Sequence, residues 1–216
     1  MATRDGRRKP RSSKLPTRIP TLGYYCIVTD TKETEKNYLD GLKESLPDSL
    51  RDKLVIKVFS AQKTSMLVEE AQRQHNLHSQ YAEPWIVFDR DRVTNFDDII
   101  SMAHEKNIKV GWSNPCIEIW LHAYYGSMPN HSDSVACWKG FATVYKTKTK
   151  QEYDKADKSI YRKLCETGSE NTAIRIAAQR LQQKERDGFS KPSLMTGTTT
   201  VHLLINSIRE KASFDE

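Results

Sequence analysis

Two carboxylates, Asp89 and Asp91, directly follow a short apolar run at residues 85–88. Such a run is typical of a strand buried on both faces in a parallel sheet. Residues two apart on a strand point to the same side, and in open α/β sheets the functional crevice lies beyond the carboxyl ends of the strands. Two carboxylates held this close repel each other unless a cation lies between them, and hard oxygen ligands suit Mg²⁺ or Mn²⁺. The alternative interpretation is a solvated turn, in which Asp is common.

A second group of acids follows another apolar run, residues 22–28. Asp30, Glu33 and Glu35 come immediately after this run, and an amphipathic helix is expected from near Thr34. The group should therefore lie at the carboxyl end of its own strand, as the first pair does. Carboxylates that converge from separate elements on a hard cation build many metal-dependent phosphoryl-transfer sites.

The elements that position these acids alternate along the first half of the chain. Apolar runs typical of strands are separated by stretches with helical periodicity. The order β-α-β-α-β-α-β favours an α/β fold with a mostly parallel sheet and helices on both faces. The expected strands are residues 22–28, 54–59, 85–88 and 108–112, and the expected helices between them are residues 34–46, 62–80 and 96–103.

The next stretch, residues 113–121, contains polar groups beside a helix start. Ser113 or Asn114 can cap a helix that has Pro115 in its first turn. Glu118 is an acid among large apolar residues. One interpretation places Glu118, or the Ser113–Asn114 pair, at the same edge of the sheet as the other acids. The other interpretation is a capping acid that interacts favourably with the helix dipole.

Basic and aromatic side chains are interleaved in the segment 126–150. Interleaving of this kind can hold a nucleic-acid strand, but a small helical subdomain with inward-packed aromatics explains it equally well. The residues concerned are Lys146 and Lys148 together with Trp138, Phe141 and Tyr145. Further helices are expected at residues 158–166, 170–186 and 201–211, with a polar loop over 192–200.

Positive charge is concentrated near the start of the chain, within a net charge of +6 and an isoelectric point of about 9.0. Three prolines break any helix over residues 1–20, so a basic, flexible arm is expected. The arm can contact nucleic-acid phosphates without sequence preference, or it can be a solvated tail. The arm residues proposed for nucleic-acid contact are Arg7, Arg8, Lys9 and Arg11.

The remaining composition points to a cytoplasmic protein. The sequence has no apolar run long enough to span a membrane and no apolar signal-peptide core. Its four cysteines are widely spaced, and Cys26 and Cys116 have apolar surroundings, which predicts reduced thiols. At 216 residues the chain suits one domain with elaborations: the arm at 1–20, an α/β core at 21–125, and a mainly helical C-terminal extension at 126–216 packed on the core.

Four motifs in order resemble those of the RloB-like proteins, a family with a Toprim-like core. The stretch IVTDTKETEKNY at 27–38 is similar to the family's I-V-C-E-G-E-K-T-E-P-N-Y, and VFDRD at 87–91 to its V-F-D-x-D. SNPCIEIWL at 113–121 is similar to S-N-P-x-F-E-x-W-L, and TTTVH at 198–202 to the final S-T-x-V-H. The resemblance covers most of the chain after the basic arm.

The resemblance implies a Toprim active site, in which an acid after the first strand acts with a D-x-D pair to bind Mg²⁺ and cleave or join phosphodiesters. It also implies a place in bacterial anti-phage defence, often beside an ATPase of the ABC or AAA type. This sequence departs from the family pattern where Asp30-Thr31 replaces Glu-Gly. Asp is one methylene shorter than Glu, so either Asp30 still reaches the metal, or Glu33 or Glu35 takes that role, or the site is weakened.

Two hypotheses follow. In the first, the chain is a Mg²⁺- or Mn²⁺-dependent nuclease that cuts RNA, tRNA included, or DNA. In the second, it is a catalytically silent Toprim-like module that binds a partner ATPase or nucleic acid, and in either case it can form homo-oligomers. For the first hypothesis the metal ligands are Asp30, Asp89 and Asp91, the further catalytic acid is Glu35, and the supporting residues are Glu33, Asn114 and Glu118.

Overall fold

The computed structural model describes residues 20–50, 52–78, 82–91 and 93–213. The basic arm, including Arg7, Arg8, Lys9 and Arg11, lies outside these residues, so its predicted contacts stay predictions. Within the described ranges no helix is long and apolar enough to cross a membrane. All four cysteines are free, and Cys26 and Cys116 are buried as expected.

A five-stranded sheet forms the centre of the molecule, in the order β2-β1-β3-β4-β5. Neighbouring strands are parallel except at one edge, where β5 runs antiparallel to β4. The α/β class and the mostly parallel sheet are therefore confirmed. The strands are β1 (Gly23–Thr29), β2 (Leu54–Ser60), β3 (Ala82–Asp89), β4 (Lys109–Asn114) and β5 (Thr198–Thr199).

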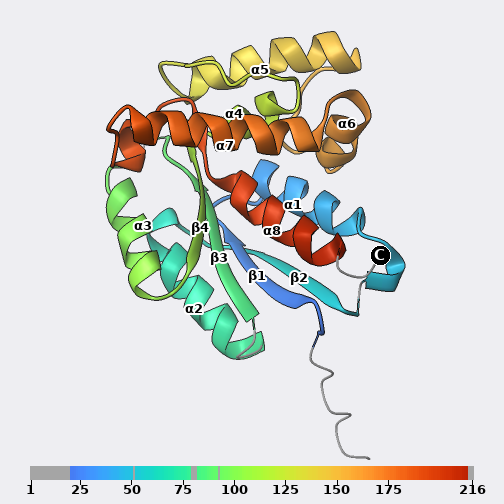
Figure 1. Cartoon of the computed structure of the whole chain (residues 1–216), viewed down its shortest axis with the longest axis vertical. Helices are drawn as coiled ribbons and strands as arrows, with labels where there is room; N and C mark the ends of the chain where they lie inside the picture. The colour runs from blue at the N-terminus through green and yellow to red at the C-terminus, as the bar shows by residue number, and fades with distance from the viewer. Residues whose placement is uncertain (1–19, 51, 79–81, 92, 214–216) are drawn as a thin grey trace, which may run out of the picture.

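Helices cover both faces of the sheet because alternate strand residues point to opposite sides. Trp85 and Val87 of β3 belong to one apolar cluster with residues of α1 and α8, whereas Ile86 and Phe88 belong to another with residues of α2 and α3. Figure 1 shows these two pairs of helices on opposite sides of the strands. Their bounds are α1 (Thr34–Glu44), α2 (Leu67–His78), α3 (Phe96–Glu105) and α8 (Val201–Ser213).

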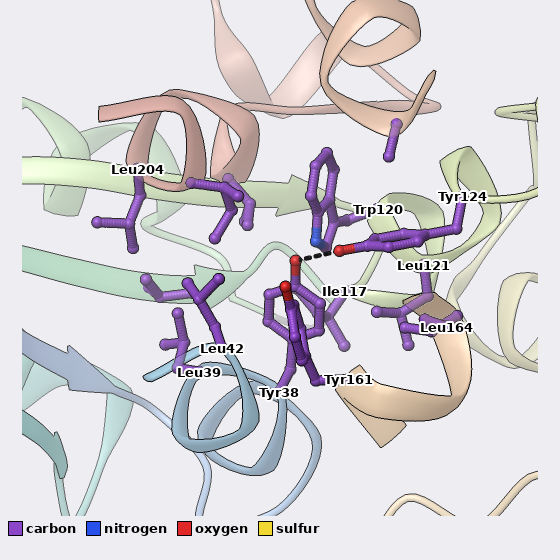
Figure 2. Packing of buried hydrophobic residues seen from close by; sticks show 14 of the residues in the cluster. Tyr38, Leu39, Leu42, Ile117, Trp120, Leu121, Tyr124, Tyr161, Leu164 and Leu204 are labelled. Atoms are coloured by element: carbon purple, nitrogen blue, oxygen red, sulfur yellow. Dashed lines mark hydrogen bonds between the residues drawn. The ribbon is translucent and has the colours of Figure 1, made fainter. Parts of the chain in front are cut away.

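A further group of helices lies beyond the carboxyl ends of the parallel strands, at the top of Figure 1. It packs into the same cluster as α1: Figure 2 shows Tyr38 of α1 among Trp120, Tyr124 and Tyr161, with the Tyr38 and Tyr124 hydroxyls 2.7 Å apart in a hydrogen bond. The group comprises α4 (Glu118–Ala123), α5 (Ser134–Thr149), α6 (Ile160–Thr167) and α7 (Glu170–Arg186).

Two local predictions are wrong. Ser113 and Asn114 do not cap a helix, because β4 continues through Asn114 and α4 begins only at Glu118. The predicted polar loop over 192–200 contains β5, in which Thr198 and Thr199 pair with Asn114 and Ser113. The 126–150 segment is largely helical, and Phe141 and Tyr145 are buried, as the inward-packed interpretation predicts.

Candidate functional site

A cleft of about 540 Å³ opens at the carboxyl ends of β1 and β3. Its floor comes from the strand ends and the start of α1, and its far side from α5 and the loop before α6. It brings together the acids predicted at the ends of the strands expected at 22–28 and 85–88. The lining residues that carry the arguments below are Asp30, Glu33, Glu35, Asp89, Asp91 and Lys155.

Asp30 and Asp89 are brought together by the pairing of β1 with β3. Thr29 lies opposite Val87 in the register, and the backbone N–H of Asp30 donates to the Val87 carbonyl at 3.3 Å. One carboxylate oxygen of each aspartate is buried and has no hydrogen-bond partner among the described residues. Buried polar atoms without partners are rare in native structures and call for an explanation.

Burial and mutual repulsion make these acids unusually hard to ionise. Burial, reinforced by the charges of Glu35 and Asp30, raises the pKa of Asp89 well above its ordinary value. Burial and the neighbouring Glu35 raise the pKa of Asp30 to about 8. Glu35 is 3 % exposed, and burial raises its pKa although its carboxylate accepts a hydrogen bond from the Thr31 hydroxyl. Shared sites of this kind disfavour the charged forms unless a cation enters.

Asp91 reaches the cleft by a turn rather than by strand alternation. β3 ends at Asp89, and Asp91 has a φ of 23°, a conformation that few residues other than glycine adopt. Its backbone N–H donates to the Pro115 carbonyl at 2.9 Å, and its carboxylate accepts a hydrogen bond from the Ser134 hydroxyl at 2.5 Å. The side chain is therefore exposed at the rim, tied to the first turn of α5.

The donor chemistry of Asp30 and Asp89 fits a hard divalent cation. Both offer unpaired oxygens, and a cation between them would offset the burial and the repulsion that raise their pKa values. Among the described residues, no group of three or more His, Cys, Asp or Glu side chains is already arranged to hold a metal ion. A third ligand would have to come from a shift of Asp91 or Glu35, or from the substrate.

The other predicted residues are divided between the cleft and its surroundings. Glu33 lines the cleft and is exposed. Asn114 is buried, and its amide donates to the carbonyls of Pro192 (3.0 Å) and Ser193 (3.1 Å), so it fixes the segment before β5. Lys146 and Lys148 lie exposed near the end of α5 and do not line the cleft.

Glu118 lies beneath the cleft, fully buried in the first turn of α4. Its Oε1 accepts a hydrogen bond from the Tyr153 hydroxyl at 3.1 Å and lies 3.2 Å from the Lys155 Nζ. Burial lowers the pKa of Lys155, but Glu118 outweighs it and the net pKa is raised. Glu118 therefore anchors Lys155, whose ammonium faces the acidic floor.

Two cleft residues, Lys155 and Trp138, were not among the individual site residues proposed from the sequence, although Trp138 lies in the segment that was expected to be able to hold a nucleic-acid strand. Lys155 is the one basic side chain among the described residues that line the cleft. Its backbone carbonyl accepts a hydrogen bond from the Thr34 hydroxyl at 3.3 Å, which holds its loop against α1. The contact joins positions far apart in the chain, and no local pattern reveals it. Trp138 was visible in the sequence only as one of three aromatics on a helix.

The sequence model described as "RloB-like protein" matches residues 25–208 of the chain. The match includes every acid that lines the cleft, the anchor Glu118, and both unexpected residues. No curated protein and no solved structure matches the chain.

Proposed function

Because the chain belongs to the RloB-like protein family, we propose that it is a Mg²⁺-dependent nuclease of a bacterial anti-phage defence system. The observation that carries the proposal is the pair of buried, unpaired carboxylate oxygens on Asp30 and Asp89 at the carboxyl edge of a parallel sheet. Open α/β sheets bind their ligands at this edge. The substrate would be an RNA, tRNA included, or a DNA.

Asp30 and Asp89 would hold the cation, with Asp91 or Glu35 completing the set. When bound, Mg²⁺ supplies a Lewis acid for the scissile phosphate and lowers the pKa of a water nucleophile. Thr31 holds the Glu35 carboxylate in place through its hydrogen bond. Asp91 lies exposed at the rim, where the Ser134 hydroxyl holds its carboxylate.

Lys155 would compensate for the negative charge of the floor. A phosphodiester approaching five carboxylates meets strong repulsion, and one ammonium at the cleft wall offsets part of it. Glu118 keeps that ammonium in position from below. We assign Lys155 the contact with a non-bridging phosphate oxygen, and Glu118 the positioning of Lys155.

A second candidate is a silent Toprim-like module that binds an ABC- or AAA-type ATPase. Asp30-Thr31 stands where the family pattern has Glu-Gly, and the described acids are not pre-assembled as a three-ligand cluster. Under this second candidate function the cleft would have no catalytic activity, and an ATPase or nucleic acid would bind elsewhere on the protein.

The deciding experiment compares wild type with Asp89→Asn on plasmid DNA and total bacterial RNA. Each protein is incubated with Mg²⁺, with Mn²⁺ or with a chelator, alone and with a co-expressed ATPase encoded beside it. Asp98→Asn is the matched control, because Asp98 is an exposed acid on α3 that does not line the cleft. Metal-dependent cleavage lost only in Asp89→Asn supports the nuclease. No cleavage under any condition supports the silent module, and equal cleavage by all three proteins would show that the activity does not arise at Asp89.

A further inference from the structure

The cleft has walls of two kinds. The acids occupy the strand ends, but the opposite side is apolar. Val135 and Trp138 lie on one face of α5, one helical turn apart, and Val135 is 53 % exposed. A ligand that fills the cleft therefore meets charge on one side and a flat hydrocarbon surface on the other. The apolar side is completed by Val93, Cys116 and Ile117.

Trp138 differs from the other aromatic residues of α5. Phe141 and Tyr145 are fully buried and pack against each other and against Tyr153. Trp138 is only partly buried against the same cluster, and among the described residues it packs on no other ring. Of the three aromatics interleaved with lysines, Trp138 is thus the one available to a ligand.

The apolar wall is fixed relative to the acids. The Asp133 carboxylate caps α5 by accepting a hydrogen bond from the Ala136 N–H at 2.8 Å. In the same turn, the Ser134 hydroxyl donates to Asp91. Val135 and Trp138 therefore stand beside the acid that forms the rim, and a group resting on them is adjacent to whatever the acids bind.

We propose that Val135 and Trp138 receive an unpaired nucleobase next to the scissile phosphate, so that the substrate is a single-stranded or looped segment. The inference rests on the proposed nuclease function and narrows its substrate class. A nucleotide is the unit in which an anionic phosphate and a flat apolar ring lie side by side. In a duplex both faces of each base are already stacked, so only an unpaired or flipped base can lie against Trp138.

The test measures binding and cleavage separately. Fluorescence anisotropy gives the Kd of a labelled 12-nucleotide single strand and of the same sequence as a duplex, with Ca²⁺ in place of Mg²⁺. The variants are W138A, W138F and V135A. V144A is the matched control, because it makes the same substitution as V135A on the same helix at a residue that does not line the cleft.

Wild type should bind the single strand at least about tenfold more tightly than the duplex. W138A should weaken single-strand binding by about 5- to 150-fold, the range found for removal of a base-stacking aromatic. W138F should retain most of the affinity, V135A should lose less than W138A, and V144A should match wild type. Equal Kd values for wild type and W138A, a preference for duplex, or no binding of either probe would overturn the inference.

Cleavage with Mg²⁺ separates this inference from the proposed function. Tryptophan-dependent preference for single strands without cleavage would leave the base site standing and remove the nuclease. Cleavage of duplex at equal rates by wild type and W138A would leave the nuclease standing and remove the base site.

Discussion

Asp30 and Asp89 are buried close together, and their burial disfavours the state in which both carboxyl groups are ionised. Each carries a raised pKa, and each keeps one oxygen buried without a partner. Without a cation, the folded state keeps protons that the unfolded chain would release near pH 4. The stability of the metal-free protein therefore depends on pH in a direction opposite to that of ordinary salt-bridged aspartates.

The first prediction concerns Asp30→Asn in chelator. The folded pKa of Asp30 is about 8, whereas that of an unfolded Asp is near 4, so wild type loses stability as pH rises through this window and the loss is complete above it. Asp30→Asn removes that loss. Its Tm should match wild type near pH 4 and exceed it by at least about 3 °C at pH 8. Circular dichroism melts at both pH values check this, with Asp98→Asn as the control.

A Tm difference that does not change between the two pH values would contradict that account. Added Mg²⁺ gives a second reading of the same melts. Wild type should gain stability at pH 8 because ligands that bind the folded state stabilise it, and Asp30→Asn should gain less.

The Lys155–Glu118 pair supports a second prediction. Lys155→Met leaves a fully buried Glu118 without its counter-charge, which should lower the free energy of unfolding by about 1–3 kcal/mol, less than for a fully buried pair because Lys155 is half exposed. Adding Glu118→Gln to this variant should restore part of the loss, because no buried charge then remains. Urea denaturation of the two single variants and the double variant measures the coupling.

Lys158→Met controls for loss of a lysine from the same loop, since Lys158 is exposed and does not line the cleft. Additive effects in the double variant would show that Lys155 and Glu118 do not interact. Cleavage assays distinguish an effect of the Lys155 charge on activity from its effect on stability. A further variant, Lys155→Arg, keeps the charge and should keep much of the activity that Lys155→Met loses.

At the scale of elements, α1 carries Glu35 and is seated against α6 by a close approach at Gly41. A Cβ added there would lie 2.7 Å from the Tyr161 Cβ, closer than real Cβ contacts. We therefore predict that Gly41→Ala destabilises the protein by about 1–3 kcal/mol, although Ala is by itself the better helix former. Thermal or urea unfolding measures the change.

Gly140→Ala is the matched control for Gly41→Ala. A Cβ at Gly140 would also meet an atom at 2.7 Å, but that atom is the Cε1 at the end of the His131 side chain, which can turn away. Gly140→Ala should therefore cost less than Gly41→Ala. If Gly140→Ala instead destabilises the protein more than Gly41→Ala, the contact between α1 and α6 is not the more rigid of the two.

Elements with strong local patterns could be predicted from the sequence, and those made by distant contacts could not. β1 to β4 and helices α1 to α3 follow from apolar runs and helical spacing. β5 could not be predicted, because two threonines form a strand only when β4 lies beside them. Asn114 was predicted as a helix cap, but its amide donates hydrogen bonds to the carbonyls of Pro192 and Ser193, which are far away in the chain.

The same distinction separates the parts of the candidate site. Asp30, Asp89 and Asp91 were expected together because parallel strands bring their carboxyl ends to one edge. Lys155 was missed because its partner Glu118 and its backbone contact with Thr34 both lie outside its own segment. The metal and the substrate stay predictions, since donor chemistry and family membership support them without testing them.

At the scale of the whole molecule, one apolar cluster joins the sheet to the helices after residue 126. Ile27 of β1 and Trp85 of β3 share it with Phe141 of α5 and Leu204 of α8. We predict that a fragment ending at residue 125 does not fold, because it would expose this face of the sheet. The measurement is near-ultraviolet circular dichroism of residues 1–125 beside the full chain, which should itself unfold in one transition.

A folded, cooperatively melting fragment would instead make residues 21–125 an independent domain with the C-terminal part as an addition. Coincident urea transitions by tryptophan fluorescence and by far-ultraviolet circular dichroism in the full chain are the companion test of a single unit.

The late position of β5 and α8 has a consequence for the timing of synthesis. The acids Asp30 and Asp89 emerge early from the ribosome, yet β4 acquires its edge partner, and Asn114 its hydrogen bonds, only when residues 192–199 have been made. The face of the sheet that α1 packs on is completely covered only when α8 has joined it. An unfinished chain thus has the reactive groups without the frame that holds them. A protein proposed to be a nuclease would, in this order of synthesis, assemble its site only when translation is almost complete.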